Sequence, residues 1–181
     1  MSRVLVRAYE RRKTVFLFGN GGSAALASHF ACDLSKGTVN GSSVRYRALA
    51  LTDNVPVMTA WANDASYEDI FAEQLATFAS PGDVAFAISA SGNSPNVIKA
   101  LKMAKQSGMV TTGITGFSGG RMARLCAARI VVPCDNMQII EDLHMCIAHS
   151  LFTCVREAIS RHNGEVSTSV GPQLVLRTAI K

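Results

Sequence analysis

Two short segments rich in glycine and serine are the part of this chain best suited to chemistry. The first, Gly19-Asn20-Gly21-Gly22-Ser23, follows an apolar run and precedes a segment compatible with a helix. The second, Ser89-Ala90-Ser91-Gly92-Asn93-Ser94, has the same placement. Glycines let backbone N–H groups approach an anion, serines add hydroxyl donors, and a helix N-terminus carries partial positive charge. Together the two segments predict a site for one phosphorylated polyol.

The two segments also have a purely structural interpretation, as tight strand-to-helix connections. Neither contains a lysine, and the pattern G-x-x-x-x-G-K-[ST] of nucleotide hydrolases is absent. The first also fails G-x-G-x-x-G, because Ala24 stands where the last glycine belongs. The chain therefore offers an anion site but not the pattern of a nucleotide hydrolase.

His29 and Asp33 are four residues apart on the helix expected after the first segment. This spacing places them about 40° from each other around the helix axis and roughly 6 Å along it, so they share a face. An imidazole and a carboxylate so placed can hold a metal ion or act on one substrate. A hydrogen-bonded structural histidine is the alternative for His29.

The last expected helix carries Glu141, Asp142, His144 and His149 in an otherwise apolar segment. Glu141 and His149 are eight residues apart, about 80° around the axis and roughly 12 Å along it, so convergence needs extended side chains or a helix that begins after Glu141. In the alternative, the two acids complement the helix dipole and both histidines are buried and hydrogen-bonded. Asn63 and Asp64, after a shorter helical segment, suit sugar hydroxyls, although turn chemistry explains them equally well.

Short apolar runs alternate with helical patterns, which predicts a three-layer α/β/α sandwich with a mostly parallel five-stranded sheet. The expected strands are residues 14–18, 46–51, 83–89, 110–114 and 129–132, and the expected helices are residues 23–34, 57–61, 67–78, 95–106, 120–125 and 138–159. Ligands bind at the carboxyl ends of strands in such sheets, where both glycine and serine segments fall. Residues 1–162 are expected to form one domain and residues 163–181 a flexible tail, with a terminal strand or a partner-binding extension as alternatives.

Composition limits the function classes. The chain of 181 residues is 48% hydrophobic and has a formal charge of +5, without a long basic run, so nothing supports nucleic-acid binding. Without a long apolar run or a signal-peptide core, we expect a cytoplasmic protein that does not enter a membrane. Five cysteines without C-x-x-C spacing (Cys32, Cys126, Cys134, Cys146 and Cys154) are expected to be reduced and mostly buried.

A set of motifs resembles the phosphoheptose isomerase branch of the sugar isomerase (SIS) domain family. In chain order they are Gly19–Ser23, His29-Phe30-Ala31, Ala62-Asn63-Asp64, Pro81-Gly82-Asp83-Val84, Ser91-Gly92-Asn93-Ser94-Pro95-Asn96-Val97-Ile98-Lys99-Ala100 and Thr115-Gly116. The resemblance runs from about Val15 to Ile159. It implies an aldose–ketose isomerase that converts sedoheptulose 7-phosphate to D-glycero-D-manno-heptose 7-phosphate through an enediol. It also implies an assembly of identical subunits, a tetramer or dimer, with active sites near subunit contacts.

Carried over by position, the resemblance implies three sets of site residues. The substrate would contact Asn20, Gly21, Gly22, Ser23, Asp33, Asn63, Asp64, Ser89, Ala90, Ser91, Ser94 and Glu141. Some members carry zinc, and here Zn²⁺ or another divalent ion would be held by His29, Asp33, Glu141 and His149. Asp33 is the candidate base and His149 the candidate acid.

This chain departs from the family at three places. Asp33 stands where the family usually has glutamate, and Glu141 where it usually has glutamine. The shorter side chain could displace a base by about 1 Å, enough to impair proton transfer. Only 13 residues precede the first expected strand, where relatives have a longer helical region. Two other functions stay open: a non-catalytic sugar-phosphate-binding regulator, of which one type binds a replication initiator, and an isomerase of another sugar phosphate.

Overall fold

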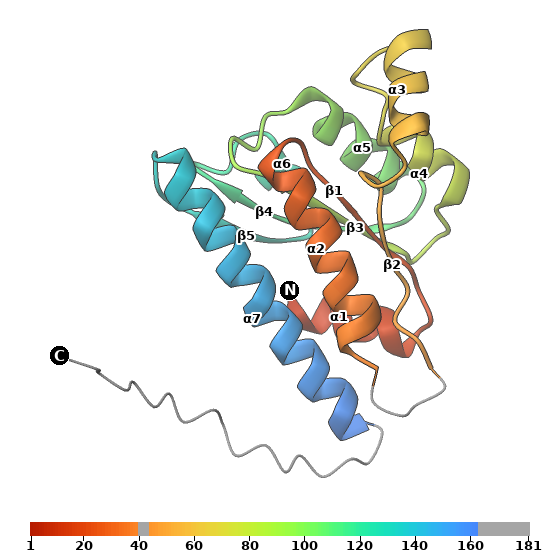
Figure 1. The fold of residues 1–181 in the computed structure, drawn as a ribbon, viewed down its shortest axis with the longest axis vertical. Helices are drawn as coiled ribbons and strands as arrows, with labels where there is room; N and C mark the ends of the chain where they lie inside the picture. Colours follow the sequence, from red (N-terminus) through yellow and green to blue (C-terminus); the bar gives the residue numbers. More distant parts are fainter. Residues whose placement is uncertain (40–43, 163–181) are drawn as a thin grey trace, which may run out of the picture.

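Within the described residues, 1–39 and 44–162, five strands form one sheet in the order β2-β1-β3-β4-β5 (Figure 1). In this computed structural model the strands are β1 (Val15–Phe18), β2 (Ala48–Ala50), β3 (Val84–Ser89), β4 (Val110–Gly116) and β5 (Ala128–Val132). All neighbouring pairs are parallel. Strand β1 pairs with β2 on one side and with β3 on the other, so the order of the strands reverses at β1. The carboxyl ends of β1 and β3 therefore flank the point where such sheets bind ligands.

The central strands are buried on both faces, because helices cover each side of the sheet. Along β1, Val15 and Leu17 belong to one hydrophobic cluster, whereas Phe16 and Phe18 belong to another. This alternation follows from the two-residue period of a strand. It explains why the apolar runs in the sequence are continuous rather than alternating.

The helices form the two outer layers of the predicted sandwich. They are α1 (Ser2–Glu10), α2 (Gly22–Gly37), α3 (Val55–Asp64), α4 (Ala72–Phe78), α5 (Pro95–Gln106), α6 (Met122–Leu125) and α7 (Met137–His162). Buried residues of α1, α2 and α7 pack on one face of the sheet, and those of α4, α5 and α6 on the other. Figure 1 shows α2 and α7 side by side. Helix α3 contacts the second cluster through the partly buried Met58 and Ala62 and has no fully buried residue.

The largest difference from the sequence prediction is α1, which was not expected. Its buried residues, Leu5, Ala8 and Tyr9, have the spacing of a helix face, so the signal was present but short. Helix α3 is longer than the predicted helix 57–61, and α4 is shorter than the predicted helix 67–78. The predicted tail lies outside the described residues.

The expectation of mostly buried cysteines was wrong. All five are free, but Cys32, Cys146 and Cys154 are exposed. The cause is their position on the outer faces of α2 and α7, which the surrounding apolar sequence does not reveal. Cys126 is buried, and burial raises the pKa of its thiol to about 11.

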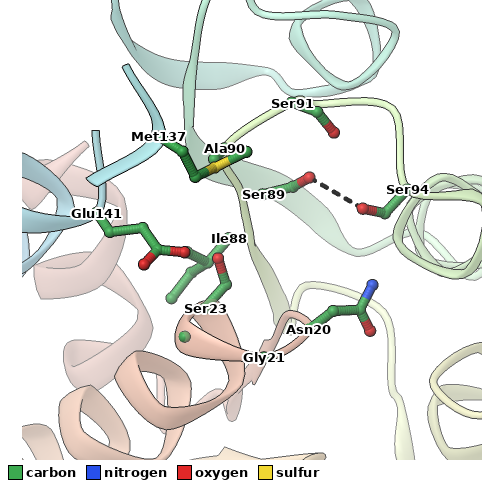
Figure 2. Close-up of a pocket in the computed structure, with 11 residues that line it drawn as sticks. Asn20, Gly21, Ser23, Ile88, Ser89, Ala90, Ser91, Ser94, Met137 and Glu141 are labelled. Atoms are coloured by element: carbon green, nitrogen blue, oxygen red, sulfur yellow. Dashed lines mark hydrogen bonds between the residues drawn. The ribbon is translucent and has the colours of Figure 1, made fainter. Parts of the chain in front are cut away.

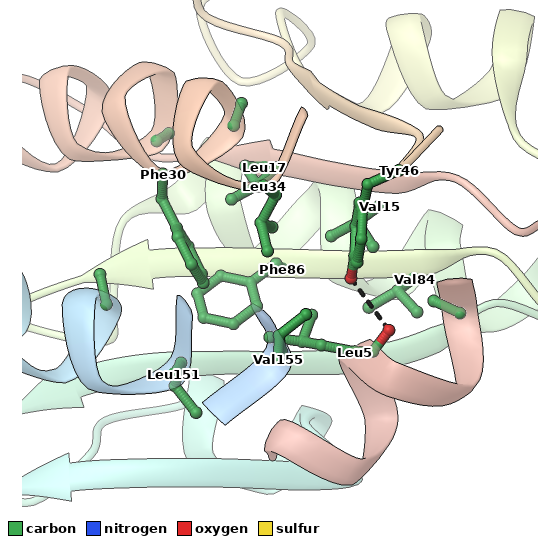
Figure 3. Packing of buried hydrophobic residues seen from close by; sticks show 14 of the residues in the cluster. Leu5, Val15, Leu17, Phe30, Leu34, Tyr46, Val84, Phe86, Leu151 and Val155 are labelled. Carbon is green, nitrogen blue, oxygen red and sulfur yellow. Dashed lines mark hydrogen bonds between the residues drawn. The ribbon is translucent and has the colours of Figure 1, made fainter. Parts of the chain in front are cut away.

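One aromatic contact joins the sheet to α2 in the larger core (Figure 3). Phe86 of β3 and Phe30 of α2 are fully buried, with ring centroids 5.4 Å apart in an edge-to-face arrangement. Nearby, the hydroxyl of Tyr46 donates to the carbonyl of Leu5 at 3.0 Å, and burial raises the pKa of Tyr46. These contacts hold α1 and α2 against the sheet.

No helix within residues 1–39 and 44–162 combines the length and the hydrophobicity that a bilayer crossing requires. The cytoplasmic location stays a prediction.

Phe86→Ala is expected to lower the free energy of unfolding by about 3–5 kcal/mol, because the substitution removes a fully buried ring and leaves a cavity. Phe78→Ala is the matched control, since that ring is 58% exposed and the same change should cost within about 0.5 kcal/mol. Urea denaturation of both variants measures the difference. Equal losses would contradict the packing described for Phe86.

Candidate active site

A pocket of about 300 Å³ lies between the ends of β1 and β3 (Figure 2). It is lined by residues of both glycine and serine segments, by Ile88, and by two residues of α7: Asn20, Gly21, Gly22, Ser23, Ile88, Ser89, Ala90, Ser91, Ser94, Met137 and Glu141. The structure therefore brings together all eight positions of these two segments that were expected to contact substrate. We call this pocket the cradle.

The N-termini of two helices lie at the cradle, and neither has a side-chain cap. Helix α2 begins at Gly22 after Gly21, and α5 begins at Pro95 after Ser94, and neither preceding residue makes a capping hydrogen bond. Instead, the Ser94 and Ser89 hydroxyl oxygens lie 3.3 Å apart (Figure 2). Free N–H groups, hydroxyls and helix dipoles are what an anion needs at such a position.

Gly92 is required by the tight path of the second segment. Its φ is +63°, and a Cβ atom there would lie 2.3 Å from the carbonyl oxygen of Gly119. Both facts exclude a larger residue without movement of the backbone. The segment can therefore turn sharply and direct Ser89, Ser91 and Ser94 toward one volume.

Glu141 of α7 lies across the cradle from Ser94 (Figure 2). Its carboxylate packs so closely on Gly22 that a Cβ atom there would be 3.0 Å from either carboxylate oxygen. No lysine or arginine of the described residues lines this pocket. An anion bound here would be held by neutral donors and helix N-termini.

A second group forms where α2 and α7 pack side by side. The Nε2 atoms of His29 and His149 are 2.9 Å apart, and Oδ2 of Asp33 lies 3.5 Å from the first and 4.0 Å from the second. The side chain of Asp33 is 23% exposed, whereas both imidazoles are about half exposed. The predicted pairing of His29 with Asp33 is thus present, with His149 added from α7.

The three donor atoms have the geometry of a candidate metal centre. They all lie within 4.8 Å of one another. In a tetrahedral zinc site with bonds of about 2.0–2.1 Å, donor atoms are about 3.3 Å apart, so the observed distances fit after small side-chain movements. Two histidines and one carboxylate leave a fourth position for water or substrate, as in catalytic zinc sites.

Glu141, expected as a fourth ligand, does not join this group. Helix α7 is continuous from Met137, so the alternative of a helix that begins after Glu141 does not apply. Eight residues of helix then separate Glu141 from His149 by roughly 12 Å along the axis. The carboxylate of Glu141 faces the cradle instead.

The cradle is continued between α2 and α7 by a second cavity of about 240 Å³, which shares Gly22, Ser23 and Glu141 with the cradle and adds Leu26 and Met145. His29, Asp33 and His149 line neither cavity. One helical turn after Leu26 and Met145, on the same helix faces, come His29 and His149. From Ser23 to His29 the helix rises roughly 9 Å, a span that an extended seven-carbon sugar phosphate can bridge.

His144 borders the same cavity and is almost completely buried. Neither ring nitrogen has a hydrogen-bond partner of normal geometry among the described residues, so for His144 the alternative of a buried histidine holds in its burial but not in its hydrogen bonds. Burial lowers its pKa, and the Thr115 backbone and the Glu141 carboxylate act in the opposite direction. The ring is therefore neutral near pH 7.

Asn63 and Asp64 do not border either cavity. They are the exposed last residues of α3, where the amide of Asn63 donates to Oδ1 of Asp64 at 2.7 Å. Conversely, sequence reasoning missed Ile88 and Met137 as lining residues. Ile88 could have been inferred from its place before Ser89 at the strand end, whereas Met137 carries no chemical signal.

Comparisons with known proteins agree on one family. Residues 1–116 match the model described as SIS domain. The chain is 40% identical over 158 residues to phosphoheptose isomerase of Aneurinibacillus thermoaerophilus, covering 87% of this chain and 79% of that protein. It is 42% identical over 144 residues to the enzyme of Paramagnetospirillum magneticum, covering 76% and 71%. The structure of phosphoheptose isomerase from Neisseria gonorrhoeae matches with a TM-score of 0.80 at 30% identity, covering 86% and 83%.

His144 should make the protein less stable as the pH falls. Its folded-state pKa lies below the ordinary 6.5, so below about pH 6.5 the unfolded chain takes up a proton that the buried ring does not. His144→Leu removes this difference, and its free energy of unfolding should fall less than that of the unsubstituted protein between pH 7.5 and 5. Denaturation at several pH values measures this. The control is His162→Leu at an exposed position, and an unchanged pH dependence in His144→Leu would refute the assignment.

Proposed function

The chain belongs to the SIS domain family, and from this membership we infer that it is a phosphoheptose isomerase, an enzyme that interconverts sedoheptulose 7-phosphate and D-glycero-D-manno-heptose 7-phosphate. One observation of the structure carries the proposal: the anion cradle continues into a cavity between α2 and α7, and a His–Asp–His group lies about one helical turn beyond that cavity on the same two helices. The cradle suits the phosphate, and the group suits the reacting carbons at the other end of the sugar.

In this arrangement the phosphate is held by the hydroxyls of Ser89, Ser91 and Ser94 and by the positive end of the α5 dipole. Asn20 and Ser23, with the backbone of Gly21 and Gly22, contact the phosphate end of the sugar from the other segment. Glu141 accepts hydrogen bonds from sugar hydroxyls, since a carboxylate beside a phosphate dianion would be repelled. Length then becomes a basis of selectivity, because a shorter sugar would not reach His29.

The reaction requires transfer of a proton between C1 and C2. We assign the base to Asp33: it takes the proton from C1, the C–H electron pair forms the C1=C2 bond of the enediol, and the carbonyl oxygen O2 gains a proton from His149. Return of a proton to C2 and loss of the O1 proton then give the aldehyde. Since Oδ2 of Asp33 lies beside both imidazoles, Oδ1 is the oxygen that we assign to proton transfer.

We propose that His29, Asp33 and His149 also hold a divalent ion, with zinc as the first candidate. Such an ion would polarise the substrate carbonyl and stabilise negative charge on the enediolate oxygens. Asp33 and His149 then each have two competing roles, because permanent ligation lowers the basicity of Asp33 and leaves only Nδ1 of His149 to carry a proton. Because aspartate is one methylene shorter than glutamate, the Asp33 carboxylate has little reach with which to bind the ion and remove the C1 proton at separate positions.

A non-catalytic sugar-phosphate regulator is the alternative function. It would need the cradle but not the His29, Asp33 and His149 group. The close approach of these three side chains, supplied by two helices, therefore favours the enzyme.

We propose further that α3 packs against a second copy of the chain. Val55 and Trp61 are exposed apolar residues on a helix with no buried residue, which is unfavourable for a helix facing water alone. In such an assembly, Asn63 and Asp64 at the end of α3 could contact substrate in a neighbouring subunit. This would reconcile their implied binding role with their distance from the cradle.

Trp61→Asp is expected to convert the oligomer to smaller species, because it places a charge in the apolar contact of α3. Phe78→Asp on α4 is the matched control, since that side chain is also exposed but lies outside α3. Sedimentation velocity gives the mass of each. The proposal would be abandoned if the unsubstituted chain sediments as a monomer or if both variants behave alike.

Asp33→Asn is expected to lower kcat by about 10²- to 10⁴-fold, because an amide cannot accept the C1 proton. Glu141→Gln keeps the length of the side chain and should cause a smaller loss in kcat. The assay follows the isomerisation of sedoheptulose 7-phosphate and the uptake of deuterium from solvent at saturating zinc. The metal content of each variant is measured in parallel. Hexose and pentose phosphates serve as competing substrates.

The opposite pattern, with loss of deuterium uptake only in Glu141→Gln, would assign the base to Glu141. Binding of the sugar phosphate without any exchange in the unsubstituted protein would favour the regulator. A metal content unaffected by Asp33→Asn would remove Asp33 from the ligand set.

A further inference from the structure

The two segments of the cradle are joined by a reciprocal pair of side-chain amides. Nδ2 of Asn20 donates to Oδ1 of Asn96 at 2.9 Å, and Nδ2 of Asn96 donates back to Oδ1 of Asn20 at 2.8 Å. Asn20 follows β1, whereas Asn96 is the second residue of α5. The pair therefore bridges the two strand ends between which the cradle lies.

Asn96 is fixed by its surroundings. It is 1% exposed, and its Oδ1 also accepts a hydrogen bond from the backbone N–H of Val97 at 2.9 Å. Its oxygen therefore accepts two hydrogen bonds and its amide nitrogen donates one. A buried amide with these partners has one preferred orientation, because rotation by 180° would set two donors against each other and two acceptors against each other.

Asn96 in turn orients Asn20. Oδ1 of Asn20 accepts from Asn96 and from the hydroxyl of Tyr67 at 3.2 Å, so both of its lone pairs are used. One N–H of Asn20 is donated to Asn96. The group that Asn20 can still offer to the cradle, which it lines, is its second N–H. In Figure 2 its amide nitrogen points toward the side where Ser94 lies.

We propose that Asn96 is a positioning residue for the isomerase: it holds the two segments of the cradle at a fixed separation and makes Asn20 present an N–H donor, not an oxygen, to the sugar phosphate. This rests on the proposed function. An oxygen in that position would repel phosphate, so the orientation decides whether Asn20 helps or hinders binding. Asn96 acts through Asn20 and has no contact with substrate of its own.

The test is Asn96→Asp, which keeps the shape and both accepting contacts of Oδ1 but cannot donate to Asn20. KM for sedoheptulose 7-phosphate is expected to rise about tenfold, the effect of one lost hydrogen bond in a binding site, while kcat stays within about twofold. The effect should shrink in the Asn20→Ala background, because Asn20 is the residue through which Asn96 acts. Asn54→Asp is the matched control, since among the described residues the Asn54 side chain makes one hydrogen bond, in which its oxygen accepts from the Val57 N–H at the start of α3.

Three results would overturn the proposal: an unchanged KM in Asn96→Asp, a rise that persists undiminished beside Asn20→Ala, or an equal rise in Asn54→Asp. Should Asn96→Asp fail to fold, Tyr67→Phe answers the same question at an exposed residue. It removes only the donor to Oδ1 of Asn20 and is expected to raise KM about threefold. An unchanged KM there would count against the proposal.

The side-chain NH₂ signals of Asn20 in the NMR spectrum test the pair without any substrate. The N–H that is donated to Asn96 should exchange with solvent more slowly than the N–H that faces the cradle, and both signals should change position in Asn96→Asp but not in Asn54→Asp. If the unsubstituted protein does not act on sedoheptulose 7-phosphate, the proposed function fails while this measurement still decides the geometry. Equally rapid exchange of both Asn20 signals would overturn the pair itself.

Discussion

The close parallel packing of α2 against α7 is the contact on which the whole site depends. Two glycines of α2 permit it: Gly22 lies against the carboxylate of Glu141, and a Cβ atom at Gly37 would be 2.6 Å from the ring of Phe152. Between these two contacts, His29 meets His149. Larger residues at the two glycines would push the helices apart, and the imidazoles could then no longer reach one another. The candidate metal centre and the cavity between the two helices are therefore products of helix packing more than of any local motif.

The cradle is electrically neutral apart from Glu141, and this has consequences for binding. A phosphate dianion there would be held by N–H groups, hydroxyls and the ends of two helix dipoles, each of which contributes modestly. Such a site depends on orientation more than a lysine-based site does, because a dipole attracts only from its positive end. The fixed amide pair of Asn20 and Asn96 suits this requirement.

Much of the fold could be predicted because strands buried on both faces leave an unambiguous apolar signal. The same runs placed both glycine and serine segments at carboxyl ends of neighbouring strands, which was enough to predict the cradle. Helix α1 was missed because its three buried residues span barely one turn. The pairing of Asn20 with Asn96 joins residues 76 positions apart, and no local pattern marks it. The spacing of Glu141 and His149 in the sequence indicated that the two side chains would be far apart on a continuous helix. The sequence did not show that α7 is continuous across both residues, and the separation depends on this.

The carboxylates of Asp33 and Glu141 lie at different ends of the candidate site. Asp33 is one turn along α2 from His29, and its short side chain keeps Oδ2 within 3.5 Å of Nε2 of His29. The Glu141 side chain instead extends from α7 across to Gly22 at the edge of the cradle. A shorter acid at 141 would leave the gap beside Gly22 unfilled. Each side-chain length therefore fits the distance that it spans, and the two ends of the site are served by different acids.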